Sequence, residues 1–348
     1  MVRSALSFMQ FIVSTLEQKY VANNGKKTMH LLNTIKQYLF KYLRGFSPPL
    51  EKTYEKTTVL QSLLIAKSNR SKERVKCLSE VEFSGFSQWG EDGIIDWLIE
   101  KLPEIPKTFI EFGVEDYRES NTRLLLHLRN WRGFVMDGSA EHISNIKRQD
   151  VSWRYDLTAS CAFIDRENIT QLIAASGLSG NIGLMSVDID GNDYWVWQAI
   201  DTVNPAIVVC EYNAVFGDLH QISVPYQADF QRTHAHYSNL YFGASLPALM
   251  ELANQKGYVF IGTNSNGCNA FFVQKDLAPA VMNSITEIKA FPSSIREARD
   301  SAGNLSFARG IERVEIIRHL PVFDFKTKSI RLLGDIGNLY SSEWLQES

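Results

Sequence analysis

Residues 183–193 read Gly-Leu-Met-Ser-Val-Asp-Ile-Asp-Gly-Asn-Asp, a short apolar run that ends in three closely spaced carboxylates. Such a short, apolar run is typical of a strand that is buried on both faces of a parallel sheet. A helix is expected to follow directly, from Asp193 through Ile200. This order of strand, polar turn and helix favours an α/β fold, in which polar side chains collect where strands end.

Segments of the same kind recur on both sides of this stretch. Short apolar strands that alternate with helices predict a mostly parallel sheet, with helices covering both of its faces. We expect strands over 108–112, 133–137, 183–189, 206–211, 258–261 and 270–273, and helices over 121–128, 141–148, 193–200 and 245–256.

The first candidate ligand-binding residues follow the strand at 108–112, because ligands of such sheets bind outside the carboxyl ends of strands. Glu111 places a carboxylate there, and Gly113 lets the backbone pass close to a ligand. Asn121 is expected to begin the next helix, whose free N–H groups suit a polar or anionic group. Glu115 stands where a pyrophosphate-binding loop needs glycine, which counts against NAD and FAD and favours a nucleoside without phosphates.

The second set of candidates is Asp137, Gly138 and Ser139, which follow the strand at 133–137. Asp137 lies 24 positions after Gly113, and an acidic residue about 20 positions beyond a glycine turn typically binds ribose hydroxyls. An Asp-Gly pair at a strand end is otherwise often only a turn. The spacing favours the ribose role.

The third set of candidates consists of carboxylates. Asp188 and Asp190 end one expected strand, where side chains two apart share a direction, and Glu211 ends the next strand. Carboxylates that converge on one pocket repel unless a cation, a proton or a cationic substrate offsets them. They could act as a general base or bind Mg²⁺ or Mn²⁺, and His220 is a further candidate base. Asp193 is expected only to cap the following helix.

Residues 185–193 resemble the hydrophobic-x-x-Asp-Val-Glu-Gly-x-Glu segment of the FkbM-type S-adenosylmethionine-dependent methyltransferases. The turn at 111–113, the Asn-Thr pair at 121–122 and the segment 208–211 follow the order and spacing of that family. The resemblance covers roughly 83–275 and implies a class I, Rossmann-like methyltransferase fold. The first motif departs from the family, since Glu-Phe-Gly-Val-Glu-Asp stands where Asp-x-Gly-Ala-Asn-x-Gly is usual.

The first functional hypothesis is therefore an S-adenosylmethionine-dependent O-methyltransferase acting on a hydroxyl of a glycan, a glycolipid or a related metabolite. An alternative is a non-catalytic methyltransferase-like module that serves as a scaffold in a glycan or metabolite assembly, because the first motif is irregular. The expected cofactor-binding residues are Glu111, Gly113, Glu115, Asn121, Asp137, Gly138, Ser139 and Asp188; the expected catalytic residues are Asp188, Asp190, Glu211 and His220; the candidate metal ligands are Asp188, Asp190 and Glu211.

A carbohydrate acceptor needs aromatic rings to stack on and amide groups as hydrogen-bond partners. Most aromatic side chains are expected in the core, so the sugar remains a hypothesis. The candidate rings are Trp89, Trp195, Tyr226 and Tyr241, and the candidate amides are Asn213 and Asn269.

The composition is that of an ordinary globular enzyme, with 348 residues, 45% hydrophobic side chains and a net charge of −3. It excludes a disordered tail protein and a small disulfide scaffold, and it argues against a dedicated nucleic-acid binder. Four cysteines without a C-x-x-C pair indicate free thiols, and no apolar run reaches the roughly 18 residues of a membrane helix. We therefore expect a cytoplasmic protein.

The charge is divided unequally along the chain. Residues 1–80 contain 14 Lys and Arg against 5 Asp and Glu, a net charge of +9, whereas 81–348 have a net charge of −12. We expect a basic helical extension over 1–80, the methyltransferase-like domain over 81–280 and a helical or irregular extension over 281–348. The basic extension is expected to pack on the main domain or to contact a protein or an anionic membrane surface.

Overall fold

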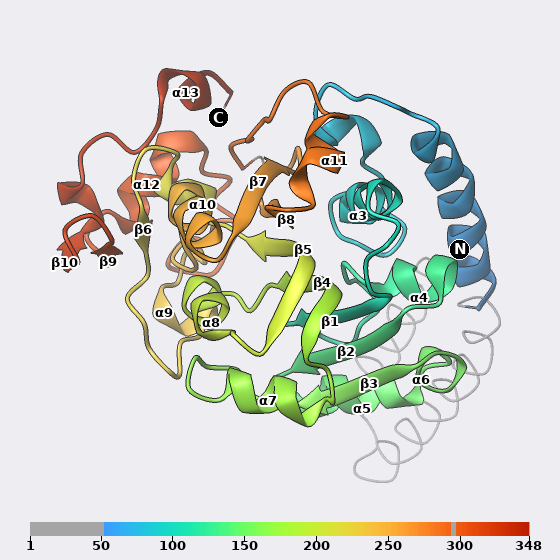
Figure 1. The fold of residues 1–348 in the computed structure, drawn as a ribbon. Coiled ribbons are helices and arrows are strands. Elements are labelled where there is room, and N and C mark those ends of the chain that lie inside the picture. Colours follow the sequence, from blue (N-terminus) through green and yellow to red (C-terminus); the bar gives the residue numbers. More distant parts are fainter. Residues whose placement is uncertain (1–51, 294–296, 348) are drawn as a thin grey trace, which may run out of the picture. The chain divides into compact units, whose positions relative to one another are not determined.

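The computed structural model describes residues 52–293 and 297–347 (Figure 1). Most of the predicted basic extension lies outside the described residues, although 52–70 are helical. The chain separates into two compact units, Met1–Thr58 and Val59–Ser348, and all the described strands belong to the second unit. None of the helices in the described residues combines the length and apolar character needed to cross a bilayer.

A seven-stranded sheet organises the larger unit (Figure 1). Its strands are β1 (Thr108–Phe112), β2 (Arg132–Asp137), β3 (Leu157–Cys161), β4 (Gly180–Val187), β5 (Val203–Glu211), β7 (Tyr258–Thr263) and β8 (Asn269–Gln274). They lie in the order β3-β2-β1-β4-β5-β8-β7, with β1 to β5 parallel and β8 antiparallel to β5 and β7. This confirms the predicted Rossmann-like α/β sheet of a class I methyltransferase fold.

Helices cover both faces of the sheet, and a separate apolar core fills each face. The core that includes Ile95 and Phe109 joins one face to its helices, and the core that includes Phe112 and Trp197 joins the other. The first face carries α3 (Glu91–Lys101), α4 (Arg123–Arg129), α5 (Ala140–Arg148), α6 (Val151–Arg154) and α11 (Ala278–Met282); the second carries α7 (Ile169–Ala175), α8 (Asp193–Ala199) and α10 (Leu246–Gln255).

The strand order reverses between β1 and β4. From β1 the chain moves outward to β2 and β3, and it then returns to place β4 on the other side of β1. Ligands of such sheets bind in the crevice outside the carboxyl ends of the strands at this point. Gly113 directly follows β1 and Asp188 directly follows β4, so two of the predicted site residues begin the loops that border the crevice.

Several elements were not predicted, among them the helices α3, α6 and α7. Strand β3 was not expected, because it lies at the edge of the sheet with partly exposed side chains and carries little apolar signal. The region after residue 280 was expected to be helical or irregular, yet it contributes two strands to a second sheet of order β10-β9-β6. The remaining elements are β6 (Ile222–Ser223), α9 (Arg232–Ala235), α12 (Gly310–Ile317), β9 (Pro321–Asp324), β10 (Ser329–Leu332) and α13 (Ser342–Glu347).

Candidate functional site

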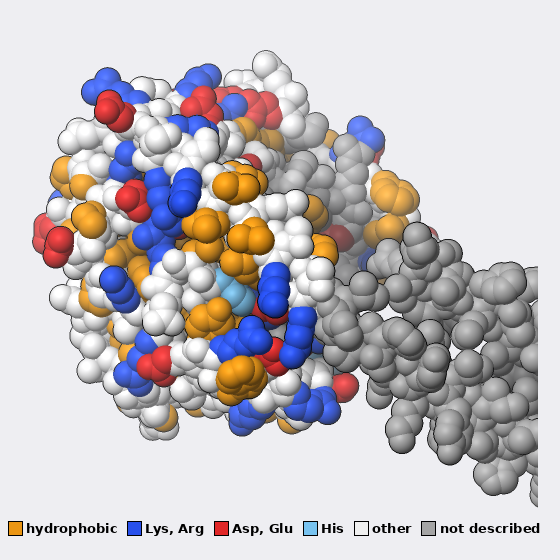
Figure 2. Space-filling view, turned by 90° about the vertical axis from the view of Figure 1, so that its right-hand side faces the viewer, with side chains coloured by type: hydrophobic (Ala, Val, Ile, Leu, Met, Phe, Trp, Pro, Cys, Tyr) orange, Lys and Arg blue, Asp and Glu red, His pale blue; other side chains and the backbone are white. Residues whose placement is uncertain are grey.

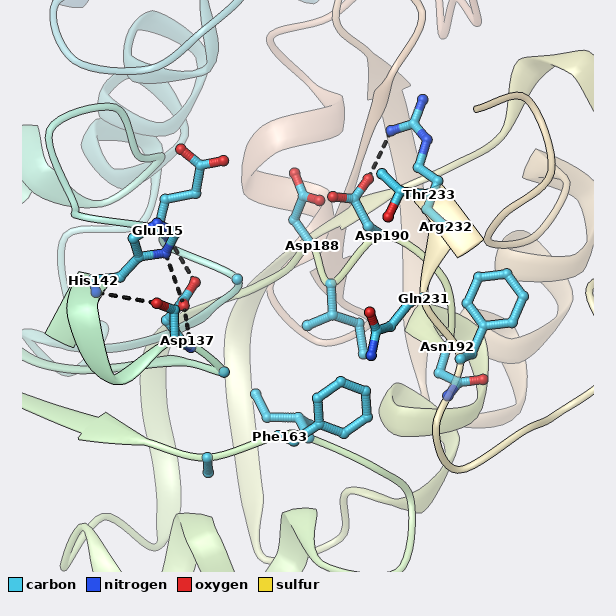
Figure 3. Close-up of a pocket in the computed structure, with 17 residues that line it drawn as sticks. Glu115, Asp137, His142, Phe163, Asp188, Asp190, Asn192, Gln231, Arg232 and Thr233 are labelled. Atoms are coloured by element: carbon cyan, nitrogen blue, oxygen red, sulfur yellow. Dashed lines mark hydrogen bonds and ion pairs between the residues drawn. The ribbon is translucent and has the colours of Figure 1, made fainter. Parts of the chain in front are cut away.

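Two adjoining cavities open at the carboxyl ends of β1, β4 and β5. The first, called the cofactor-side cavity after the role proposed for it below, has a volume of about 460 Å³ and is bordered by the segments after β1, β2, β3 and β4 (Figure 3). The second, called the acceptor-side cavity for the same reason, has a volume of about 300 Å³ and is bordered by the segments after β1 and β4, by the end of β5 and by the 88–89 segment. Both volumes are of the order found in small-molecule sites. The residues shared by the two cavities are Gly113, Glu115, Asp188, Asp190 and Arg232.

Gly113 fits the crevice because the ends of β1 and β4 approach each other there. Its φ is +71°, and a Cβ at this position would lie 1.7 Å from the carbonyl oxygen of Asp188. Glycine is therefore needed at 113 first of all because the chain's own backbone, at Asp188, lies so close to it. The residue also lines both cavities, so a ligand there would lie against bare backbone.

Glu111 accepts hydrogen bonds from the residues that lead into α4. One carboxylate oxygen accepts the N–H of Asn121 at 2.8 Å, and the other accepts the N–H of Thr122 at 3.2 Å and also the Thr122 hydroxyl. Burial raises the pKa of Glu111 to about 7, although these donors oppose the shift. The N–H groups that were expected to receive a ligand are thus occupied by a carboxylate of the chain.

Asn121 does not cap the helix as predicted. The helix begins at Arg123, and the Asn121 amide instead donates to the Ser186 hydroxyl on β4 at 3.1 Å. Glu111 and Asn121 both line the acceptor-side cavity, so the structure places them at the site as supports of its wall.

Asp137 connects three segments around the cofactor-side cavity (Figure 3). Its Oδ2 accepts the N–H of Glu115 at 2.8 Å, and its Oδ1 accepts the N–H of Ser139 at 2.7 Å. The Oδ1 atom also lies 3.0 Å from Nδ1 of His142, a residue that sequence reasoning missed. Ser139 in turn caps α5, since its hydroxyl accepts the N–H of His142. Asp137, Gly138 and Ser139 all line this cavity.

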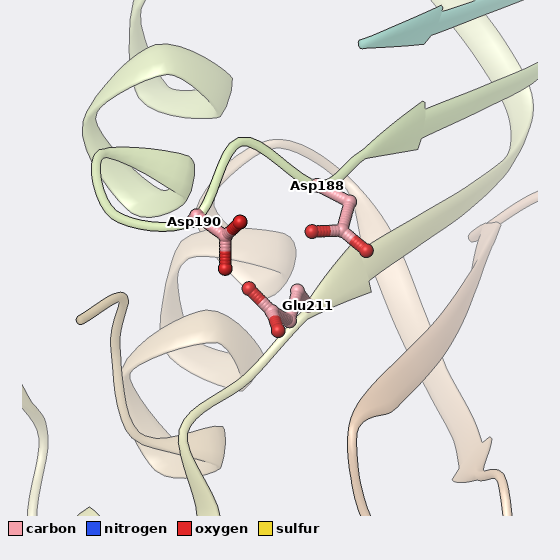
Figure 4. Close-up of side chains that lie close together, drawn as sticks. All are labelled: Asp188, Asp190 and Glu211. Carbon is pink, nitrogen blue, oxygen red and sulfur yellow. The ribbon is translucent and has the colours of Figure 1, made fainter. Parts of the chain in front are cut away.

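Asp188, Asp190 and Glu211 converge, as Figure 4 shows. Each offers one carboxylate oxygen within 4.8 Å of the others. Asp190 adopts a left-handed backbone with φ +56°, which is uncommon for a residue other than glycine. The next residue, Gly191, packs directly against Phe230, and a Cβ at 191 would lie 2.2 Å from the ring.

The role of Asp193 differs from the predicted helix cap. Its two oxygens accept the N–H groups of Ile189 and Gly191 at 2.8 and 2.9 Å, while Asn192 occupies the cap position. Asp193 therefore fixes the turn that carries Asp190. Burial raises its pKa to about 6, against the effect of these hydrogen bonds.

Arg232 supplies a cation beside the carboxylates, which is one of the three expected ways to offset their repulsion, and its position was not predicted. Its Nη1 donates to Asp190 Oδ1 at 2.7 Å, its Nη2 pairs with Glu297, and its guanidinium lies 3.8 Å from the ring centre of Phe242. Burial raises the pKa of both Asp188 and Glu211 well above the usual range. Repulsion from Asp190 adds to the shift of Asp188, and repulsion from Asp188 adds to the shift of Glu211. Arg232 opposes both shifts, so a cation and bound protons together offset the clustered charge.

His220 is not brought to this site. Its Nε2 lies 2.8 Å from the carbonyl oxygen of Asn338, and the residue lines neither cavity. The short helical turn over 214–216 carries the chain away from the end of β5 before His220 is reached. The geometry therefore gives no basis for the predicted role of His220 as a base.

Two of the six proposed sugar contacts line the acceptor-side cavity, namely Trp89 and Asn269. Trp195 and Tyr241 are buried in the core, and the Asn213 amide donates to backbone carbonyls at 240 and 242. Tyr226 packs against Arg166 and pairs with Glu167.

Three buried oxygens at the site have no hydrogen-bond donor in the described part of the chain. They are Oε2 of Glu211 and Oδ1 of Asn269 beside the acceptor-side cavity, and Oδ1 of Asn192 beside the cofactor-side cavity. Asn192 and Asn269 are only 3% and 5% exposed, so water does not reach them freely. A buried acceptor without a donor is costly, and a ligand that brings N–H or O–H groups would remove that cost.

No family model matches the chain, and no curated protein matches it. Among solved structures, the chain is similar to the N-terminal domain of EvdMO1, which was determined in the presence of S-adenosylhomocysteine and D-fucose. The two chains share 11% identity and a TM-score of 0.36, over 53% of this chain and 82% of that one. The O-methyltransferase from Bacillus cereus in complex with S-adenosylhomocysteine shows 10% identity and a TM-score of 0.34, over 62% and 89% of the two chains. A putative O-methyltransferase from Klebsiella pneumoniae shows 12% identity and a TM-score of 0.34, over 69% and 96%.

Proposed function

We propose that the chain is an S-adenosylmethionine-dependent O-methyltransferase, with the cofactor in the cofactor-side cavity and a hydroxyl-bearing acceptor in the other. The observation that carries the proposal is the pair of cavities at the switch point, which meet at Gly113, Asp188 and Asp190. A donor and an acceptor bound in adjoining cavities would meet at these residues. Methyl transfer depends mainly on such positioning.

The residues around the cofactor-side cavity suit a nucleoside. Asn192 Oδ1 lacks a donor, and a nucleoside brings donors in its ribose hydroxyls and exocyclic amine. A carboxylate has about four lone-pair sites, so Asp137 retains capacity for a ribose hydroxyl beside its three contacts. Phe163 borders the same cavity and offers a face for a base. Asp137, Asn192 and Phe163 are therefore proposed to hold the cofactor.

The carboxylates are proposed to handle the acceptor hydroxyl. When bound, S-adenosylmethionine supplies a methyl group that joins the acceptor oxygen while the electron pair of the broken carbon–sulfur bond stays on sulfur. Glu211 is the proposed general base, because its Oε2 has no other partner and would receive the hydroxyl proton. A raised pKa makes its carboxylate a stronger base, and Asp188 lies beside it to share the proton.

A divalent cation is the second way in which the same carboxylates could act. Mg²⁺ and Mn²⁺ prefer oxygen ligands, and the oxygens of Asp188, Asp190 and Glu211 lie close enough to converge on one ion after a small adjustment. The unpaired Oε2 of Glu211 supports this alternative. The ion would share Asp190 with Arg232, whose positive charge opposes it.

We also propose that the basic residues 1–80 contact a protein or a membrane surface, since their net charge is +9 whereas that of 81–348 is −12. Opposite charges favour contact with an acidic protein surface, and the same residues suit an anionic membrane. Salt-sensitive binding of the full chain to vesicles containing phosphatidylserine would support the membrane contact. Equal binding to neutral vesicles would contradict it.

The proposed function is tested by calorimetry with S-adenosylhomocysteine and by transfer of a labelled methyl group. We expect binding by the wild type and a loss of about tenfold in affinity for Asp137→Asn or Asn192→Ala, since each removes one polar contact. The control Glu104→Gln changes an exposed residue between α3 and β1, away from the carboxyl ends of the strands, and is expected to bind normally. Absence of binding at millimolar cofactor would refute the enzyme and favour the scaffold alternative.

A further inference from the structure

Carboxyl groups far outnumber basic groups around the acceptor-side cavity. Seven carboxylate side chains line it together with one cation, Arg232. Three of these carboxylates already have strong partners: Asp190 and Glu297 pair with Arg232, and Glu111 accepts the N–H groups at the start of α4. In residues 52–293 and 297–347, no ion pair reaches Glu115, Glu119, Asp188 or Glu211, which are the remaining four.

This charge is a local feature of the cavity. On the face of the molecule shown in Figure 2, Lys and Arg side chains are interspersed with acidic and hydrophobic ones. The net charge of −12 over 81–348 is thus not spread evenly. A cavity lined by one sign of charge concentrates ligands of the opposite sign.

The loop that carries Glu115 and Glu119 is held in place by its own contacts. Glu115 and Tyr117 both adopt left-handed backbone conformations, with φ of 47° and 63°. The Glu115 N–H is bound by Asp137, the Tyr117 hydroxyl meets the Thr122 hydroxyl at 2.9 Å, and the Ser120 N–H donates to Phe86. Uncommon backbone conformations persist when surrounding contacts determine them, and they cluster at ligand sites.

Glu115 and Glu119 repel each other across this loop. Burial and then the neighbouring Glu115 raise the pKa of Glu119, and no cation opposes the shift. Figure 3 shows the Glu115 side chain extending toward the same side of the cavity as Asp188 and Asp190. Trp89 lines the same cavity as the two carboxylates and is 37% exposed, so an aromatic side chain also borders it. Carboxylates beside an indole ring are the usual surroundings of a bound ammonium group.

A second observation independently points to a ligand rich in hydrogen-bond donors. Asn269 lines this cavity, is 95% buried and leaves its Oδ1 without a donor, because its amide nitrogen is directed to Glu91. Glu211, its partner in the β5–β8 register, leaves Oε2 without a donor as well. Both oxygens are therefore open to N–H or O–H donors of a ligand.

We infer that the acceptor is an amine-bearing polyol, such as an amino sugar, whose ammonium group binds between Glu115, Glu119 and Trp89 while a hydroxyl reaches Glu211. The inference rests on the proposed methyl transfer and names its substrate class. The cofactor brings one net positive charge but no group that would pair with both Glu115 and Glu119, which have no cation of the described chain beside them. The same charge disfavours acceptors that carry phosphate, such as nucleotide sugars and phosphorylated lipids.

The test uses three matched probes: glucosamine, N-acetylglucosamine and glucosamine 6-phosphate. They share a ring with free hydroxyls and differ in charge. With labelled S-adenosylmethionine we expect kcat/KM for glucosamine to exceed that for N-acetylglucosamine by about tenfold or more, with the phosphate last, and the label on oxygen. Calorimetry in the presence of S-adenosylhomocysteine should give the same order of affinity and weaken as salt is added.

Glu119→Gln and its control Glu104→Gln complete the test. Loss of the Glu119 charge is expected to reduce the preference for the amine by about threefold or more, whereas Glu104→Gln leaves it unchanged. Equal use of the amine and the amide, methylation on nitrogen, or transfer to none of the probes would overturn the inference. Binding of S-adenosylhomocysteine distinguishes failure of this inference from failure of the proposed function. If the chain binds it, the cofactor assignment stands and only the substrate class is wrong. If the chain does not bind it, the proposed function itself is refuted.

Discussion

The guanidinium of Arg232 donates a hydrogen bond to Asp190 Oδ1 at 2.7 Å and so links α9 to the turn after β4. The side chain of Arg232 is 14% exposed, and its second terminal nitrogen pairs with Glu297. One buried cation thus joins segments that are distant in the sequence. It also opposes the rise in the pKa of Asp188 and Glu211.

Replacing Arg232 is expected to shift the pH dependence of methyl transfer. Because Arg232 lowers the pKa of Asp188 and Glu211, Arg232→Gln raises the pH at which the base ionises. The rise of kcat/KM with pH should therefore move to higher pH, and activity at neutral pH should fall. Arg318→Gln, which removes an exposed pair with Glu315 on α12, should leave the profile unchanged. An unshifted profile for Arg232→Gln would contradict this electrostatic role.

Gly113→Ala is expected to destabilise the fold more than a matched change at Gly257. Both glycines have positive φ, +71° and +82°, so both variants carry the strain of a left-handed alanine, about 1 kcal/mol. Only at position 113 does the new Cβ meet an atom, the Asp188 carbonyl oxygen. We expect a loss above about 3 kcal/mol for Gly113→Ala in urea unfolding. Equal losses in the two variants would show that the crevice can widen at no cost.

The central strands could be predicted from the sequence because they are buried on both faces. Strands β1, β2, β4 and β5 each contain a short run of apolar residues, and a carboxylate lies at or just after the end of each run. Strand β3 gave no such signal, since none of its side chains is buried. The four-residue strands β9 and β10 were not predicted either, because β10 has no buried side chain and β9 has only two.

Only the site residues that lie at the ends of strands could be predicted from the sequence. Asp188, Asp190 and Glu211 follow neighbouring parallel strands, so their convergence follows from topology. Arg232 lies 42 residues from Asp190 in a segment without regular spacing, and only the folded chain brings the two together. Glu111 was placed correctly at the strand end, but its engagement with the start of α4 depends on side-chain geometry that no pattern encodes.

Glu111 is expected to make stability fall as pH rises from about 4.5 to about 7. Burial raises its pKa from 4.5 to about 7 in the folded state, so in this range the folded chain retains a proton that the unfolded chain has lost. The free energy of unfolding therefore decreases across this window, by on the order of 3 kcal/mol from this group. Urea unfolding between pH 4.5 and 7.5 measures the slope. Glu111→Gln should make the slope shallower by the share of this one group, because Asp193, whose pKa is raised to about 6, contributes in the same direction. Glu141→Gln, at an exposed position on α5, should leave the slope unchanged.

Glu211→Gln decides between the two proposed roles of the carboxylate cluster. If Glu211 is the general base, its amide variant cannot accept the hydroxyl proton, and kcat should fall by about 10² to 10⁴ while affinity for S-adenosylhomocysteine stays within about twofold. The wild-type rate should also survive EDTA, because Arg232 already supplies a cation to Asp190. Methyl-transfer kinetics with and without EDTA, together with calorimetry, measure both effects.

A metal-dependent reaction would give the opposite pattern. EDTA would abolish transfer in the wild type, Mg²⁺ or Mn²⁺ would restore it, and Glu211→Gln would lose affinity for the added ion because one of three carboxylate ligands is gone. Glu104→Gln serves as the control in both experiments, since it removes a carboxylate far from the carboxyl ends of the strands. Recovery by added metal would therefore remove Glu211 as the base and make it a ligand.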